Sequence, residues 1–272
     1  MSARSVTAAS AQDGERSALA LTFLVLLVLA AWAALVLWSA SPYARYLEHG
    51  GWGDAGVLAA LCRALPQGEV LVPALLHAAA WMLMIAAMML PTTFPLLAIF
   101  RRITGDRPDA GRLLAWVLAG FIVAWLTFGL LAHLADAILR WAAGNNGWFV
   151  ANGWMIGAGM LAGAGLFQWS ALKYRCLEQC HTPFAFIAAR WHGRAPAREA
   201  FRLGLDHGAF CVGCCWALML LMFVVGTGNL GWMLALAAVM AAEKNLPWGR
   251  RLRTPLGIGL IAWAGAITVA NT

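Results

Sequence analysis

The stretch Leu205-Asp-His207-Gly-Ala-Phe-Cys211-Val-Gly-Cys214-Cys215-Trp-Ala-Leu-Met-Leu-Leu-Met222-Phe-Val-Val225 joins a sulfur-rich beginning to a long apolar run. About 20 apolar residues in a helix cross the hydrocarbon core of a bilayer, so this stretch predicts a membrane helix over 205–225. On a helix that turns by about 100° per residue, its imidazole and three thiols fall within an arc of roughly 100°. Sulfur and imidazole ligands on one helix face suit a soft metal ion, above all Cu(I) or Zn(II).

The composition places the rest of the chain in lipid as well. Hydrophobic residues make up 62% of the 272 residues and charged residues 11%, and such a chain cannot hide its apolar surface inside a globule. The apolar runs predict about seven membrane helices, at 19–40, 71–90, 113–134, 152–169, 205–225, 230–243 and 255–270. We therefore expect an all-α polytopic membrane protein, with a polar cytoplasmic arm over 1–18 and a single transmembrane domain over 19–272.

The basic residues predict the orientation of these helices. Sixteen of the nineteen lysines and arginines lie in the N-terminal arm or in the segments 100–112, 170–206 and 243–254. The opposite side holds only Arg45, Arg63 and Arg140. Because cytoplasmic loops carry an excess of lysine and arginine, we expect the N-terminus in the cytoplasm and the C-terminus outside. The same bias explains the net charge of +7 without a nucleic-acid partner.

The segment 170–206 carries two further features. Cys176-Leu-Glu-Gln-Cys180-His181 has two thiols at i, i+4 and an adjacent imidazole. Arginines then recur every four residues, at Arg190, Arg194, Arg198 and Arg202. A basic stripe of this kind is typical of a helix that lies on an anionic membrane surface, so we expect one amphipathic surface helix over 184–203.

Five of the six cysteines lie between positions 176 and 215, at the cytoplasmic boundary of the predicted topology. In a reducing compartment they are metal ligands, redox thiols or small core-filling side chains rather than disulfides. Three thiols within five residues, with a histidine one turn before them, favour metal binding. We therefore expect a single site for copper or zinc, built from His207, Cys211 and one of Cys214 and Cys215, joined by Cys176 or Cys180.

Other side chains are candidates for supporting roles. Thioethers favour Cu(I), although a methionine stripe is also ordinary core packing. The possible accessory ligands are Met84, Met88, Met222, His77 and His181. A ligating imidazole is usually held by a carboxylate, and Glu243 and Asp206 are the candidates beside His207. The alternative for Glu243 is an interfacial ion pair of little energetic value.

Several motifs resemble an uncharacterised bacterial family of predicted metal-binding integral membrane proteins. The motifs are Trp81-Met-Leu-Met84-Ile-Ala-Ala-Met88-Met-Leu-Pro91, Gln168-Trp-Ser-Ala-Leu-Lys173 with Cys176 and Cys180, Gly204-x-x-His207-Gly-x-x-Cys211-x-Gly-Cys214-Cys215-Trp216, Asn229-Leu-Gly-Trp232-Met233 and Glu243-Lys244. They cover about 75–265, in order. The resemblance implies a bacterial inner (plasma) membrane location and this ligand set, but no particular reaction.

Three functions fit these features. The first is a membrane protein that binds copper, in preference to zinc, to handle, deliver or transport it, with a metallochaperone or a membrane-complex subunit as partner. The second is a membrane thiol-disulfide oxidoreductase that uses the cysteine pairs, and the third is a non-catalytic subunit of a larger membrane complex. No phosphate loop, nucleophile elbow or Ser/His/Asp set is visible, which favours a binding role over an enzymatic one.

Overall fold

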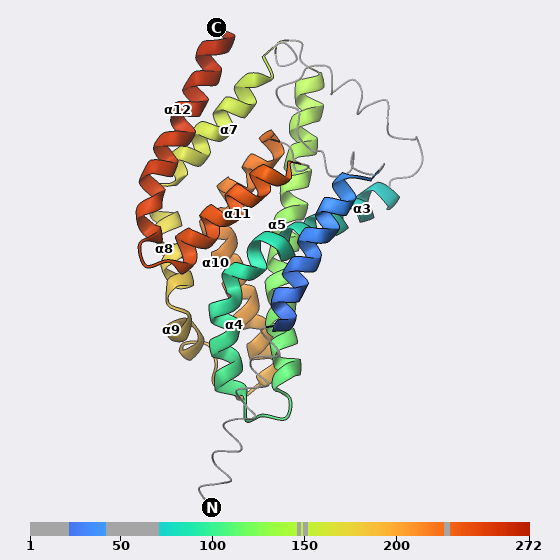
Figure 1. Cartoon of the computed structure of the whole chain (residues 1–272), viewed down its shortest axis with the longest axis vertical. Coiled ribbons are helices and arrows are strands. Elements are labelled where there is room, and N and C mark those ends of the chain that lie inside the picture. The colour runs from blue at the N-terminus through green and yellow to red at the C-terminus, as the bar shows by residue number, and fades with distance from the viewer. Residues whose placement is uncertain (1–21, 42–70, 146–147, 149–151, 226–228) are drawn as a thin grey trace, which may run out of the picture.

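The computed structural model describes residues 22–41, 71–145, 148, 152–225 and 229–272, and in these residues the chain forms helices and connecting turns without a β-strand. The polar arm predicted over 1–18 lies outside the described residues. Figure 1 shows an elongated bundle in which α7 and α12 run side by side along one edge. The described part of the chain is therefore all-α, as the apolar runs predict.

Most of the helices are long enough to be compared directly with the predicted ones. They are the helix Thr22–Ser39, α3 (Leu71–Met84), the π-helix η2 (Ile85–Met89), α4 (Leu90–Thr104), α5 (Ala110–Gly144), α7 (Trp154–Phe167), α8 (Ala171–His181), α9 (Pro183–Ala188), α10 (Pro196–Val225), α11 (Leu230–Asn245), the 3₁₀ turn η3 (Gly249–Leu252) and α12 (Arg253–Asn271). Every predicted membrane helix overlaps one of them.

Five of these helices are long and apolar enough to cross a membrane. The spans are Thr22–Ser39, Ala78–Thr104, Ala110–Asp136, Pro196–Met222 and Gly249–Asn271. A sixth span arises if α7 and α8, which meet at a bend of 61°, are taken together. The predicted helix at 230–243 corresponds to α11, which has 16 residues and is not among these candidate spans.

The second predicted helix, at 71–90, continues to Thr104 through a change of helix type. The π-helical segment Ile85–Met89 lies between α3 and α4, and Figure 1 shows α4 running in a different direction from α3. Pro91 is tolerated because it stands in the first turn of α4, where its missing N–H is not needed. Short π-helical segments inside helices are frequent at functional sites, and this one faces the core with Met88 and Met89.

The amphipathic surface helix predicted over 184–203 is wrong as a single element. The chain forms the short α9, then a loop over 189–195, and α10 already begins at Pro196. Gly193 has a φ of +71°, which breaks the helix, and Glu199 accepts hydrogen bonds from four backbone N–H groups of the loop, those of residues 192–195. Consequently α10 starts nine residues before the predicted 205 and carries Arg198 and Arg202 itself.

Because α10 begins earlier than predicted, its thiols lie further along the helix than the sequence analysis expects. Cys211 lies fifteen residues beyond Pro196, which is about 22 Å along a helix that rises 1.5 Å per residue. The cysteines of α10 are therefore in the second half of the candidate span Pro196–Met222, not near its beginning.

Helices α5 and α10 form the most extensive contact in the bundle, and glycines make it possible. A Cβ atom on Gly204 would lie 1.9 Å from the carbonyl oxygen of Val117, and one on Gly120 would lie 2.1 Å from that of Phe201. The two backbones thus approach as closely as small residues allow in membrane helix pairs. This contact fixes the face of α10 that bears the thiols.

Candidate metal centre

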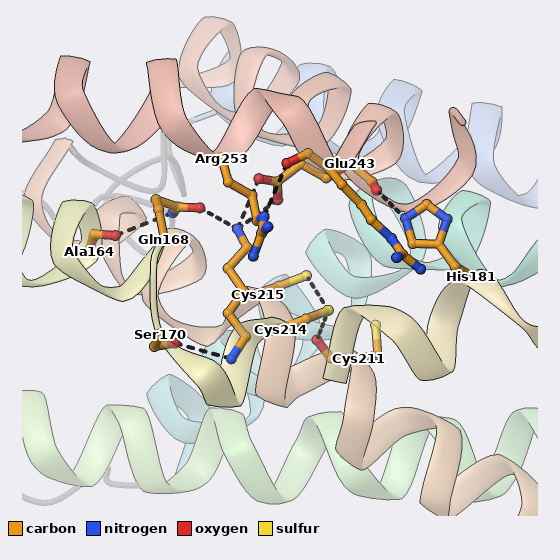
Figure 2. Close-up of polar contacts among 11 residues, drawn as sticks. Ala164, Gln168, Ser170, His181, Cys211, Cys214, Cys215, Glu243 and Arg253 are labelled. Atoms are coloured by element: carbon orange, nitrogen blue, oxygen red, sulfur yellow. Dashed lines mark hydrogen bonds and ion pairs between the residues drawn. The ribbon is translucent and has the colours of Figure 1, made fainter. Parts of the chain in front are cut away.

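Five thiols from two helices meet on the inner side of α10. Cys211, Cys214 and Cys215 of α10 are buried, and so is Cys176 of α8, while Cys180 is half-buried. All five are free thiols. These five cysteines are among the side chains that the sequence analysis expects as ligands, and Figure 2 shows the three α10 cysteines on the side of the helix that faces the charged residues.

Neighbouring thiols of this group contact one another directly. The Sγ atoms of Cys214 and Cys215 are 3.3 Å apart, and the Cys214 thiol also donates to the carbonyl oxygen of Cys211 at 3.1 Å. The Cys180 thiol is close enough to Cys214 to interact with it, as Cys211 is with Cys215. Two helices thus supply one continuous group of sulfur atoms.

Gly213 lets the two helices bring their thiols together. A Cβ atom at this position would lie 2.6 Å from the Sγ atom of Cys176. The glycine between Cys211 and Cys214 is therefore the gap into which the α8 thiol fits. Sequence reasoning missed this role, because a glycine inside a helical pattern has no partner until the second helix is known.

A buried ammonium group contacts the thiols directly. Nζ of Lys244, from the end of α11, lies 2.8 Å from Sγ of Cys211 and 3.4 Å from Oγ1 of Thr92 on α4. The lysine is 3% exposed. A buried charge is costly unless it is paired, so the Cys211 sulfur is the natural counter-charge for this lysine.

A second buried lysine forms a separate polar group beside the first. Nζ of Lys173 lies 2.9 and 2.8 Å from the two carboxylate oxygens of Glu243, and it also donates to the side-chain oxygen of Gln168. Gln168 in turn donates to the carbonyl oxygen of Ala164 at 3.3 Å (Figure 2). Ser170 caps α8 by accepting from the backbone N–H of Lys173 at 3.1 Å. This lysine is therefore fully satisfied by a carboxylate and an amide.

The structure places His207 one turn away from the thiols, among aromatic rings. Its ring stacks on Phe121 with centroids 6.1 Å apart and meets Phe186 edge-on at 5.7 Å. Its Nδ1 is buried, and no described residue forms a hydrogen bond with it. The carboxylates expected to hold this imidazole have other partners: Glu243 binds Lys173, and Asp206 accepts from Nε of Arg190 at 2.9 Å.

The possible accessory ligands divide into three groups. Met84, Met88 and Met222 are buried in the same core as the α10 thiols. His181 lies beside the charged residues, where its Nε2 is 2.9 Å from the carbonyl oxygen of Glu243 (Figure 2). The side chain of His77 lies outside the part of the molecule that the structure describes.

The described residues hold no group of three or more His, Cys, Asp or Glu side chains arranged for a metal ion. They do hold a donor set of the right chemistry, because thiolates are the preferred ligands of soft metals and five thiols are gathered here. Sequence reasoning missed Lys173, Gln168 and Lys244 as parts of this centre. One signal could have found the lysines, since they are the only two in a chain with seventeen arginines.

Comparisons with known proteins give one family. The model of a family described as PpoB2, copper chaperone, matches residues 78–267, which is more than two thirds of the chain and includes every described residue of the centre. No curated protein and no solved structure matches. The metal-related family expected from the motifs is thus confirmed.

Proposed function

This chain belongs to the PpoB2 copper chaperone family, and from that premise we propose that it binds Cu(I) through the buried thiols and hands the ion to a partner protein. The ligands are drawn from Cys211, Cys214 and Cys215 of α10 and from Cys176 and Cys180 of α8. The observation that carries the proposal is the gathering of five free thiols from two helices, one of which, Cys211, contacts a buried ammonium group.

The donor set supports copper as the cargo. Thiolates and thioethers select Cu(I) over harder ions, and the sulfur atoms here are surrounded by the methionines of the same core. A ligand must be deprotonated before it binds a metal, and a metal-bound thiolate of Cys211 would have the ammonium of Lys244 as a counter-charge at 2.8 Å. Burial of the α10 thiols keeps water away from the ion while it is held.

Release of the ion fits an exchange of thiolates. Cys180 is the least buried of the five described thiols, so a partner's thiol would reach the ion first on the α8 side. His207 lies one turn before Cys211, and its buried Nδ1 has no hydrogen-bond partner among the described residues. We propose it as an additional ligand between the thiols and the N-terminal half of α10.

A membrane location and a topology are also part of the proposal. We propose a bacterial inner-membrane protein with seven helices, a cytoplasmic N-terminus and an external C-terminus, and a metallochaperone or a membrane-complex subunit as the partner. The five apolar helices support a membrane protein, and the uneven distribution of basic residues supports this orientation. Reporter fusions after residues 107 and 193, both in basic segments, should report the cytoplasm, and an external signal from either would overturn it.

Copper binding is tested on the full chain purified in detergent under anaerobic conditions. Cu(I) is titrated against a chromophoric Cu(I) chelator, with wild type, Cys211→Ser and Cys62→Ser compared. Cys62 is the chain's sixth cysteine and lies outside 176–215, so it is the matched control. We expect Cys211→Ser to lose copper affinity by about tenfold or more, as the loss of a metal-binding thiolate implies, and Cys62→Ser to behave as wild type. Equal affinity of Cys211→Ser and wild type would overturn the proposal.

A further inference from the structure

Both lysines of the chain lie in the same buried centre, while the seventeen arginines supply all the other basic side chains. Lys173 is 0% exposed and Lys244 is 3% exposed. We propose that Lys244 is a selectivity residue: its fixed positive charge makes the thiol site prefer a monovalent ion to a divalent one. This inference rests on the proposed function and concerns the same site, which it says discriminates against divalent ions.

The first step is that Lys173 and Glu243 cancel each other. The ammonium and the carboxylate are in contact at 2.8 Å, and both are buried. The amide of Gln168 completes the coordination of the same ammonium. This pair therefore adds no net charge to its surroundings.

The second step is that Lys244 forms no ion pair with a carboxylate among the described residues and lies next to the sulfur atoms. Glu243 precedes it in the sequence, but the carboxylate of Glu243 is used by Lys173. The recorded neighbours of Nζ of Lys244 are Sγ of Cys211 and the neutral hydroxyl of Thr92. Its charge therefore acts mainly on the thiol group and on whatever the thiols bind.

The third step is electrostatic. The repulsion between a fixed ammonium and a bound ion is proportional to the charge of the ion, so it is twice as large for a divalent as for a monovalent ion at the same place. A monovalent ion between two thiolates has a net charge of −1, which the ammonium neutralises. A divalent ion on the same two thiolates leaves one uncompensated positive charge in a buried site, where charge is most costly.

Lysine suits this role better than arginine. Its ammonium is a compact point charge on a flexible stem, whereas a guanidinium is a planar fork built for two oxygen partners. A single sulfur atom at 2.8 Å and a single hydroxyl match the compact group. This also distinguishes Lys244 from the arginines at the ends of the helices.

The experiment measures selectivity rather than affinity alone. Ag(I) is the probe for a monovalent soft ion and Cd(II) for a divalent one, both titrated into the detergent-purified full chain. Wild type is compared with Lys244→Met, which removes the charge at nearly constant length, and with Lys244→Gln, which keeps a polar group beside Thr92. In both variants Cys211 can remain a neutral thiol, so no buried charge is left without a partner.

The matched control is the double variant Lys173→Met/Glu243→Gln, which removes the neutral pair and keeps the charge of Lys244. We expect the ratio of Ag(I) to Cd(II) affinity to fall by about tenfold in the Lys244 variants, as loss of a buried counter-charge implies, and to stay near wild type in the control. Thermal unfolding of each variant in the same detergent establishes that the measured protein is folded.

The outcomes separate the two proposals. If wild type binds neither Cu(I) nor Ag(I), the proposed function fails. If wild type binds both ions and the Ag(I) to Cd(II) ratio is unchanged in Lys244→Met and Lys244→Gln, copper binding stands and the selectivity role of Lys244 is overturned. An equal fall in the ratio in the control variant would also overturn it, because the effect would then belong to any buried charge in the centre.

Discussion

Two buried clusters follow one another along the same helices, and their side chains differ. The sulfur-rich core contains the α10 thiols, Cys176 and the buried methionines of η2, α10 and α11. The aliphatic core contains leucines, two phenylalanines, one isoleucine, one valine and one alanine from the helix Thr22–Ser39 and from α4, α5, α9 and α10, and no sulfur; Phe100, Leu113, Phe186 and Leu203 are among them. Both are fully packed, so packing does not require sulfur in this bundle. The thiols and the neighbouring lysines therefore call for another explanation, and the proposed copper binding would supply one.

The largest expected effect is in the glycine contact beside the aliphatic core. In Gly204→Ala, the new Cβ atom would lie 1.9 Å from the carbonyl oxygen of Val117, and backbone atoms cannot give way as a flexible side chain can. We expect loss of the folded protein from detergent extracts, measured by size-exclusion chromatography. The matched control is Gly159→Ala, where nothing lies within 4 Å of the new atom. If Gly204→Ala were as stable as that control, the close approach of α5 and α10 would be wrong.

The next effect tests the charged part of the sulfur-rich core. Glu243→Gln leaves the ammonium of Lys173 buried without its carboxylate, and we expect a loss of about 3–5 kcal/mol of unfolding free energy. Adding Lys173→Met should restore most of it, because the double variant has no unpaired charge. Chemical denaturation of the single and double variants measures this coupling, and additive losses would contradict the pairing.

A third change separates packing from metal binding. Leu203→Ala in the aliphatic core should destabilise the protein by about 2–5 kcal/mol, because Leu203 is fully buried and its truncation leaves a cavity. Its copper stoichiometry should nevertheless equal that of wild type in folded samples. Copper analysis after thermal selection of folded protein checks this, and a loss of copper would mean that the two cores are not independent.

The smallest effect is at the exposed turn between α4 and α5. There the hydrogen bond from Arg107 lowers the pKa of Asp109, so any stabilisation is present above the usual aspartate pKa and disappears as the pH falls through the lowered value. Because the pair is exposed and screened, we expect Asp109→Asn to leave the melting temperature unchanged between pH 7 and about pH 3. A difference in melting temperature between Asp109→Asn and wild type that changes with pH would contradict this expectation.

The helices were predictable from the sequence where apolar runs are long and uninterrupted. The runs around 113–134 and 255–270 became α5 and α12, with ends that extend further than hydropathy shows. The start of α10 was not predictable in this way, because Arg198 and Arg202 resemble a surface stripe. In the structure the helix simply continues through them, and the break lies earlier, at Gly193 and Pro196.

The candidate site was predictable in its sulfur and not in its charges. Cysteine spacing on one helix face is a local property, so the grouping of Cys211, Cys214 and Cys215 follows from helical geometry alone. The partner of Glu243 is not local, because Lys173 lies 70 residues away and the adjacent Lys244 turns to Cys211 instead. Which of the two lysines pairs with Glu243 depends on how α8 and α11 pack against α10.

The burial of both lysines also determines how the folded protein reacts with amine-modifying reagents. An acylating reagent finds no accessible lysine on the native chain, since Lys173 and Lys244 are the only two and both are enclosed. A lysine-specific protease likewise has no exposed lysine at which to cut. Modification of either lysine would therefore report opening of the centre itself, which makes amine labelling a direct measure of local unfolding around the thiols.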